Sequence, residues 1–287
     1  MDIRINGQTK VTVTEEAAYV TFPSWQVPAN VHYGYSTRLF GASKGIYASM
    51  NLGPNMGDEP EAVKENYRRF CGAIGIPEER VVLSKQTHQC NVRKVTAGDA
   101  GNGFSRPNSF TDIDALMTDE PGIPLVIFTS DCVPVFFYDP VKRVIALAHA
   151  GWRGTAGGIV TETVRAMERE YGSAPGSILA AIGPSICRKC FEVGPEVAEE
   201  FSKVFDIKAD TPGGVIFHGR DDRYHIDLWR ANELLLLGAG VKKEHITVSG
   251  VCTMCRPDLF FSHRATGGRR GSNAGFLMLN EVWNEEP

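Results

Sequence analysis

The sequence predicts an α+β protein in which mixed sheets and helices form a layered sandwich, in one domain over residues 1–287. Strand-like and helix-like runs mix without the steady alternation of a doubly wound parallel sheet. Several neighbouring strand-like runs are typical of antiparallel hairpins. No Gly/Pro-rich linker divides the 287 residues, which suffice for one large core, and no internal repeat is visible.

Composition narrows the classes of partner. Hydrophobic residues make up 43% and charged residues 22% of the chain, which is typical of a globular protein. The net charge of -4 argues against binding to nucleic acid or to an anionic membrane. No segment approaches the ~20 apolar residues of a membrane helix, and the N-terminus lacks a signal-peptide layout. We therefore expect a cytoplasmic protein with reduced thiols.

The N-terminal half is expected to be rich in strands. Residues 10–25, "KVTVTEEAAYVTFPSW", alternate apolar and polar side chains on both sides of a turn, which predicts a hairpin. A helix is expected after Pro60, with apolar positions at Val63, Tyr67 and Phe70. Further strands are expected over 31–38, 80–88 and 91–96, and residues 98–111 have the composition of a surface loop.

The C-terminal half carries clearer helix boundaries. A helix after Gly157 is expected to stop at Gly172, and Asp227 is placed to cap another helix. A third helix is expected over 194–205, and strands are expected over 177–183, 245–252, 259–264 and 275–280.

The segment 129–155, "TSDCVPVFFYDPVKRVIALAHAGWRGT", predicts a hairpin with chemistry at one end. A turn with Pro140 and Val141 at its tip, or a four-residue loop around them, places Cys132 directly opposite His149. Their Cβ atoms would then lie roughly 4.5–5.5 Å apart. A slip of one residue would instead place the two side chains on opposite faces.

Three interpretations of this pair stay open. Thiol and imidazole can form a nucleophile–base pair, or they can bind one metal ion together. They can also be a packed cysteine and a hydrogen-bonded histidine. The context favours chemistry, because "HAGWRGT" places glycines and an arginine where a strand turns into a helix. His88 in "KQTH" offers a third ligand, and two His with one Cys are typical of a catalytic zinc site.

Two CxxC pairs, Cys187 with Cys190 and Cys252 with Cys255, are a competing metal signal. In a zinc ribbon about 15–20 residues separate the two pairs, and the separation here is much larger. The spacing favours packed thiols over a four-cysteine structural zinc site.

The segments "KQTH", "TSDCVPVFFYDP", "AHAGWRGT", "GPSICRKCFEVG" and "CTMCRPDLFFSHR" together resemble the YfiH family, the laccase-domain or polyphenol-oxidase-like proteins. The resemblance implies a zinc site made by His88, Cys132 and His149, with copper as another possible metal. It also implies a layered α/β sandwich similar to that of toxin-type Cys–His hydrolases. The implied activities are phosphorolysis of adenosine, inosine and methylthioadenosine, adenosine deamination, and a polyphenol-oxidase activity using copper.

Phosphorolysis requires an anion site, for which arginine is well suited. The candidates are Arg38, Arg153 and one of the C-terminal arginines. Asp131 and Gln86 are candidates for contacts to the metal ligands or the base, although a turn cap and a strand-edge amide are equally good interpretations. Trp152 can stack on a purine or simply pack. The C-terminal arginines are Arg264, Arg269 and Arg270.

The leading hypothesis is therefore a zinc-dependent purine nucleoside phosphorylase, possibly also an adenosine deaminase, acting on nucleosides and phosphate. Its first rival is a metal-free cysteine hydrolase using Cys132 and His149. A copper polyphenol oxidase is disfavoured, because the sequence has no multicopper histidine cluster. A non-enzymatic protein whose zinc only stabilises the fold is the remaining alternative.

Overall fold

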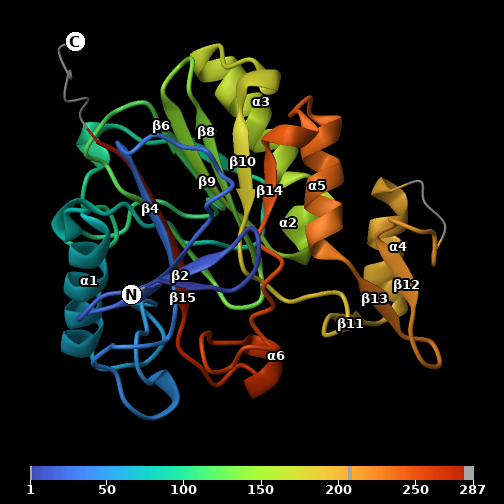
Figure 1. Ribbon diagram of the computed structural model, residues 1–287, viewed down its shortest axis with the longest axis horizontal. Helices are drawn as coiled ribbons and strands as arrows, with labels where there is room; N and C mark the ends of the chain where they lie inside the picture. The colour runs from blue at the N-terminus through green and yellow to red at the C-terminus, as the bar shows by residue number, and fades with distance from the viewer. Residues whose placement is uncertain (1, 206–208, 281–287) are drawn as a thin grey trace.

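The computed structural model describes residues 2–205 and 209–280 and shows two six-stranded sheets packed face to face (Figure 1). The first sheet has the order β1-β2-β3-β4-β15-β7 and the second the order β14-β10-β8-β9-β6-β5. The strands of the first sheet are β1 (Asp2–Arg4), β2 (Lys10–Val13), β3 (Ala18–Thr21), β4 (Val31–Ser36), β7 (Leu125–Thr129) and β15 (Asn273–Leu279). Those of the second are β5 (Val92–Lys94), β6 (Ala115–Thr118), β8 (Val133–Asp139), β9 (Val144–Ala150), β10 (Leu179–Ile182) and β14 (Ile246–Val248).

The central hairpin of the second sheet is formed by β8 and β9, as the sequence predicts, but in another register. Asp139 pairs with Val144, so the loop spans Pro140–Arg143, and His149 lies opposite Pro134 rather than Cys132. Arg143 adopts a positive φ of 55° at the end of the loop, which the expected turn did not include. The offset is two residues, and side chains alternate with a period of two. Cys132 and His149 therefore still share one face.

The alternation along β8 and β9 divides the core into two layers. Val135 and Phe137 pack toward helices, whereas Phe136 and Tyr138 pack against the first sheet. Phe136 lies among the rings of Phe22, Trp25 and Tyr33, with centroid distances of 5.5, 5.9 and 6.2 Å. Burial of these faces against each other holds the two sheets together.

Helices cover the outer faces of both sheets (Figure 1). The first sheet is covered by α1 (Pro60–Ile74), which begins at a proline and ends where Gly75 adopts a left-handed conformation, as its sequence predicts. The second is covered by α2 (Trp152–Gly157), α3 (Ile159–Tyr171) and α5 (Leu228–Gly238). The Asp227 side chain caps α5 by accepting a hydrogen bond from the Arg230 N–H.

A three-stranded sheet lies beside the main body with α4 (Pro195–Val204) (Figure 1). Its order is β11-β13-β12, and the strands are β11 (Glu192–Val193), β12 (Ile216–His218) and β13 (Tyr224–Ile226). We call this unit, residues 191–205 and 209–226, the side unit. Short 3₁₀ helices span Gly45–Tyr47, Glu78–Arg80, Ala97–Asp99, Pro175–Ser177 and Lys243–His245.

The mixed α+β layering is confirmed, but two predicted strands are wrong. Residues 80–88 form only isolated bridges at Val82 and Lys85, and residues 259–262 are irregular before α6 (His263–Thr266). The loop 98–111 is better anchored than its composition indicates, because buried Asn102 donates to the Leu83 carbonyl at 2.8 Å. Among the described residues, no helix is long and apolar enough to cross a bilayer.

Candidate active site

His149 and Cys132 lie together at one end of the second sheet. His149 is the penultimate residue of β9, on the face that packs toward the first sheet, and it is 3% exposed. Cys132 directly precedes β8 and is half-buried. The alternation of the hairpin thus points the imidazole and the thiol in the same direction.

Asp114 connects His149 to the segment that carries His88. Its buried carboxylate lies 2.8 Å from His149 Nδ1 and accepts the backbone N–H groups of Thr87, His88 and Gln89 at 2.9–3.1 Å. Burial would raise the pKa of Asp114, but the bonds from His149 and from the backbone lower it. The ionised carboxylate therefore accepts the Nδ1 proton, so Nε2 of His149 is the nitrogen that a metal ion would bind.

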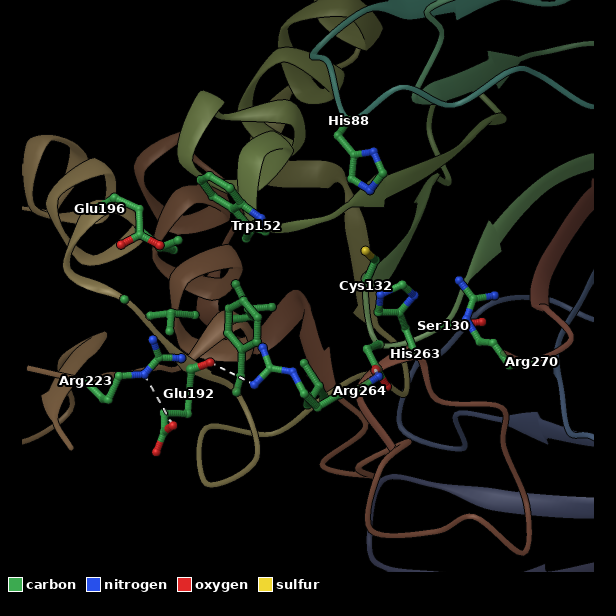
Figure 2. A pocket seen from close by; sticks show the side chains of 17 residues that line it. His88, Ser130, Cys132, Trp152, Glu192, Glu196, Arg223, His263, Arg264 and Arg270 are labelled. Carbon is green, nitrogen blue, oxygen red and sulfur yellow. Dashed lines mark hydrogen bonds and ion pairs between the residues drawn. The ribbon is translucent and has the colours of Figure 1, made fainter. Parts of the chain in front are cut away.

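His88 approaches from an exposed loop with a positive φ of 64°. Donor atoms of His88, Cys132 and His149 all lie within 4.8 Å of one another, and the two imidazole centroids are 4.9 Å apart. Figure 2 shows the His88 ring directed toward the Cys132 sulfur. The three side chains can therefore bind one metal ion and leave a further position open to the cavity.

The pKa values of Cys132 and His149 are both shifted in this site. Burial would raise the pKa of the Cys132 thiol, but His149 and His88 outweigh burial and lower the pKa to about 6. Burial would lower the pKa of His149, but Cys132 and Asp114 raise it to about 9. Near neutral pH the site therefore favours a thiolate, which is the form that binds metal and acts as a nucleophile.

The absence of a side chain at Gly151 leaves room for His88 and Cys132. A Cβ at this position would lie 2.7 Å from Cδ2 of His88 and 3.1 Å from Sγ of Cys132. Any side chain here would push His88 away, which explains a glycine directly before α2.

Asp131 holds the chain beside Cys132. It is 8% exposed, has a positive φ of 84°, and its carboxylate accepts from Thr253 Oγ1 at 2.6 Å, Ser262 Oγ at 3.0 Å and the Arg264 N–H at 2.7 Å. These bonds join the turn before β8 to the segments before β15. The structure thus gives Asp131 a positioning role at the cavity wall.

His88 and Cys132 border a cavity of about 510 Å³, a size typical of small-molecule sites. The cavity lies between the end of the second sheet and the side unit (Figure 2). His149, which is almost fully buried, is not one of the lining residues. The lining residues are His88, Ser130, Asp131, Cys132, Trp152, Ile186, Phe191, Glu192, Val193, Gly194, Glu196, Val197, Arg223, Leu228, His263, Arg264 and Arg270.

The arginines predicted from the sequence are distributed unevenly around this cavity. Arg270 and Arg264 line it, whereas Arg38, Arg153 and Arg269 do not. Arg38 donates to the carbonyls of Ala48 and Pro257 and stacks on Phe261 at 4.6 Å. Exposed Arg153 stacks on the Trp152 ring at 4.2 Å, so only the tryptophan of this pair reaches the cavity.

Arg270 has an unused donor. Its Nε is buried without a hydrogen-bond partner, while one terminal nitrogen donates to the Gly271 carbonyl at 3.0 Å. Burial lowers the pKa of Arg270, and the nearby acidic groups Asp131 and Cys132 oppose that shift. A buried donor without a partner costs free energy, and the guanidinium of Arg270 as a whole offers a cation to the cavity.

Gln86 has a different place from the one predicted. Its side-chain amide pairs with the backbone of Phe128, donating to the carbonyl at 2.8 Å and accepting the N–H at 2.7 Å. It does not line the cavity, and both ends of the amide are used by β7. The structure thus favours the interpretation of a strand-edge amide.

The family model for multi-copper polyphenol oxidoreductase laccase matches residues 32–280. Purine nucleoside phosphorylase YlmD of Geobacillus stearothermophilus is 39% identical over 87% of this chain and 90% of its own length. The chain belongs to the YfiH family. Another YfiH-family relative, purine nucleoside phosphorylase YfiH of Escherichia coli, is 37% identical over 87% of this chain and 96% of its own. Adenosine deaminase RL5, from an unknown prokaryotic organism, is 35% identical over 81% and 86%.

Solved structures support the same placement in the YfiH family. The crystal structure of YlmD from Geobacillus stearothermophilus matches with a TM-score of 0.86 at 36% identity, covering 94% of this chain and 99% of that one. The Bacillus licheniformis protein YfiH matches with the same TM-score at 32% identity, again over 94% and 99%. The expected likeness to toxin-type hydrolases stays a prediction, as does the single domain over residues 1–287.

Sequence reasoning missed Asp114, Phe191, Glu192 and Arg223. Asp114 directly precedes the buried strand β6, where a charged residue at the start of an apolar run is an available signal. The other three belong to the side unit, and nothing local in the sequence indicates that this unit closes the cavity.

Proposed function

We propose that this protein is a zinc-dependent purine nucleoside phosphorylase, which converts adenosine, inosine or methylthioadenosine and phosphate to the free base and a ribose 1-phosphate. One observation carries the proposal. His88, Cys132 and Arg270 line the same cavity, and His149 completes the group of potential metal ligands from beneath that lining. The names of the relatives support the same activity.

His88, Cys132 and His149 are the residues that would hold the metal. Two imidazoles and a thiolate suit zinc, and the same donors accept copper. The lowered pKa of Cys132 and the Asp114 bond to His149 both prepare the donors for a cation. When bound there, zinc supplies a Lewis acid at the cavity wall.

Arg270 is the residue that we expect to bind phosphate. Its planar guanidinium matches phosphate oxygens, and its free Nε needs an acceptor. The backbone of Arg264 lies beside Asp131, and its side chain extends toward the side unit, where it donates to the Glu192 carbonyl at 2.8 Å (Figure 2). Phosphate would thus be held close to Cys132 and neutralised before it attacks the sugar.

An apolar wall is available for the purine. Trp152, Ile186, Phe191 and Val197 line the cavity from α2, the loop after β10, the start of the side unit, and α4. Aromatic rings and aliphatic side chains are the usual surface for a planar base. This wall positions the base while the arginines position the phosphate.

Adenosine deamination is the second candidate, supported by the relative named adenosine deaminase RL5. It needs an acid–base group in the cavity. The Asp131 carboxylate already accepts three hydrogen bonds, so Glu192 and Glu196 are the carboxylates left to serve.

The Cys132–His149 pair also supports the metal-free hydrolase, because the pKa shifts favour a thiolate beside an imidazolium. The copper polyphenol oxidase gains less support. Within residues 2–205 and 209–280, only one group of potential metal ligands contains histidine.

The deciding experiment is a product analysis. Adenosine is incubated with purified protein, with and without phosphate and with and without metal removal, and the products are resolved by chromatography. We expect adenine and ribose 1-phosphate, dependent on both phosphate and metal. Cys132→Ala should lower the rate by about 100-fold or more, whereas Cys90→Ala, outside this cavity, should not.

Other outcomes separate the alternatives. Inosine formed without phosphate would support the deaminase. Turnover that survives complete metal removal would support the cysteine hydrolase. Absence of any product from adenosine, inosine and methylthioadenosine would overturn the phosphorylase.

A further inference from the structure

Four cysteines that the active site does not use lie together at the base of the side unit. Sγ atoms of Cys187, Cys190, Cys252 and Cys255 are all within 4.8 Å of one another. The sulfurs of Cys190 and Cys255 are 3.4 Å apart. We call these four residues the cysteine cluster.

Parallel pairing brings the two CxxC segments together. β10 and β14 are parallel neighbours, and the pairing continues beyond both strands through a bridge between Ser185 and Cys252. The Ser185 N–H donates to the Val251 carbonyl at 3.2 Å, and the Thr253 N–H donates to the Ser185 carbonyl at 3.1 Å. Two turns that are distant in sequence therefore leave the sheet side by side, so the sequence separation does not exclude a shared site.

Backbone N–H groups of both CxxC turns are directed at one sulfur atom. The N–H groups of Cys187 and Cys255 point at Cys252 Sγ, at 3.3 and 3.4 Å. Backbone N–H groups directed at sulfur stabilise a thiolate, which is the form that a metal binds.

We propose that Cys187, Cys190, Cys252 and Cys255 bind a structural zinc ion, separate from the His88–Cys132–His149 site. Zn–S bonds of about 2.3 Å in a tetrahedron require sulfurs roughly 3.8 Å apart, which the observed cluster accommodates. Four thiolates fill the coordination of zinc, so this ion has no open position and takes no part in chemistry. The proposal does not depend on the reaction that the enzyme catalyses.

The position of the cluster gives the ion its role. Phe191 and Glu192 follow Cys190 directly, begin the side unit, and line the cavity. Arg264 donates to the Glu192 carbonyl at 2.8 Å and approaches the Cys190 carbonyl at 3.5 Å. The ion would fasten this wall of the cavity to the segment after β14 and so fix the side unit against the main body.

Metal content tests the proposal. The zinc content of protein purified under reducing conditions is measured by elemental mass spectrometry. Three proteins are compared: the wild type, the Cys132→Ala variant, and the double variant Cys190→Ser, Cys255→Ser. We expect about two zinc ions per chain in the wild type and about one in each variant, because each variant removes one site. Cys90→Ser, a thiol outside both groups, serves as the control and should keep both ions.

Cobalt reports which site remains. In Cys132→Ala, cobalt bound by the cysteine cluster should show intense thiolate-to-metal absorption, and adding Cys255→Ser should weaken it. Cys255 is exposed, so this single change should leave the circular dichroism of the fold intact. Zinc missing from Cys132→Ala, unchanged zinc in the Cys190→Ser and Cys255→Ser variant, or disulfides within the cluster in wild-type protein would each overturn the proposal.

Discussion

At the scale of single residues, Asp114 organises the active site without touching the cavity. Its carboxylate accepts from three consecutive backbone N–H groups and from His149, so it fixes both the loop of His88 and the ring of His149. One side chain thus sets the distance between two of the three donors. Because Asp114 is fully buried, its own position is set by β6 and its neighbours.

Replacing Asp114 should therefore weaken metal binding. Asparagine retains the shape but brings an amide that cannot accept all four donors, so we expect Asp114→Asn to lower zinc affinity by about 10- to 100-fold. Competition with a chromogenic chelator measures this affinity. The exposed neighbour Asp112 is the matched control, since Asp112→Asn removes no hydrogen bond to a ligand segment. Equal affinities for both variants would contradict the positioning role.

At the scale of elements, a charge network on α1 ties the helix to the turn between β2 and β3. Glu65 accepts from Arg68 and Arg69 at 2.7–3.0 Å, and Arg68 also binds Glu16 at 2.9 Å. The bonds from Arg68 and Arg69 lower the pKa of Glu65 to about 2. The network is largely solvent-exposed, so its contribution to stability is small.

Glu65→Gln should lower the free energy of unfolding by about 0.5 kcal/mol at pH 7. The folded-state pKa of Glu65 is depressed, so the contribution is present above its ordinary value of 4.5 and is lost as the pH falls toward about 2. The gap between wild type and variant, measured by urea unfolding, should narrow from pH 5 to pH 3. Glu61→Gln removes an exposed ion pair with Lys64 and should show a smaller gap at every pH. A gap that widens on acidification would refute this account.

The helices were predictable because their boundaries are local, whereas the two wrong strands failed for one shared reason. The Asn273 side chain donates to the Phe261 carbonyl and accepts the Phe261 N–H, both within 3.0 Å. The Gln86 side chain forms the same two hydrogen bonds with the backbone of Phe128. In each case a side-chain amide makes the backbone hydrogen bonds that a neighbouring strand would otherwise make. An apolar run without a ladder partner resembles a strand in sequence but is not one in the fold.

At the scale of the whole molecule, the two sheets share a core centred on Phe136. This ring is fully buried in β8 and packs on aromatic side chains from the first sheet. Gly275 in β15 permits the contact, because a Cβ there would lie 3.0 Å from Phe136 Cζ. The stability of each sheet therefore depends on the other.

Phe136→Ala should lower the free energy of unfolding by about 3–5 kcal/mol, because it removes packing shared by both sheets and leaves a cavity. Urea unfolding followed by circular dichroism and by tryptophan fluorescence should still show one transition. Val141→Ala at the exposed hairpin tip is the control and should change stability by less than about 0.5 kcal/mol. Two separated transitions in the wild type would show that the sheets do not unfold together.

The candidate site was predictable to the extent that it follows from strand alternation and donor chemistry. The observed register differs by two residues from the expected one, and such a shift keeps Cys132 and His149 on the same face. The predicted proximity of the two side chains was therefore correct although the predicted turn was wrong. The arginines were not predictable in this way. Arg38 and Arg270 lie at sequence positions with similar glycine-rich surroundings, and only the tertiary fold directs one of them to the cavity.

The place of β15 has a consequence for how the molecule is assembled. This strand is the last along the described chain, yet it lies between β4 and β7 in the interior of the first sheet. A polypeptide still emerging from the ribosome thus has two unpaired edges where the finished sheet has none. Until Asn273–Leu279 has been synthesised, those edges can pair with other chains, and we expect the nascent protein to need shielding until then.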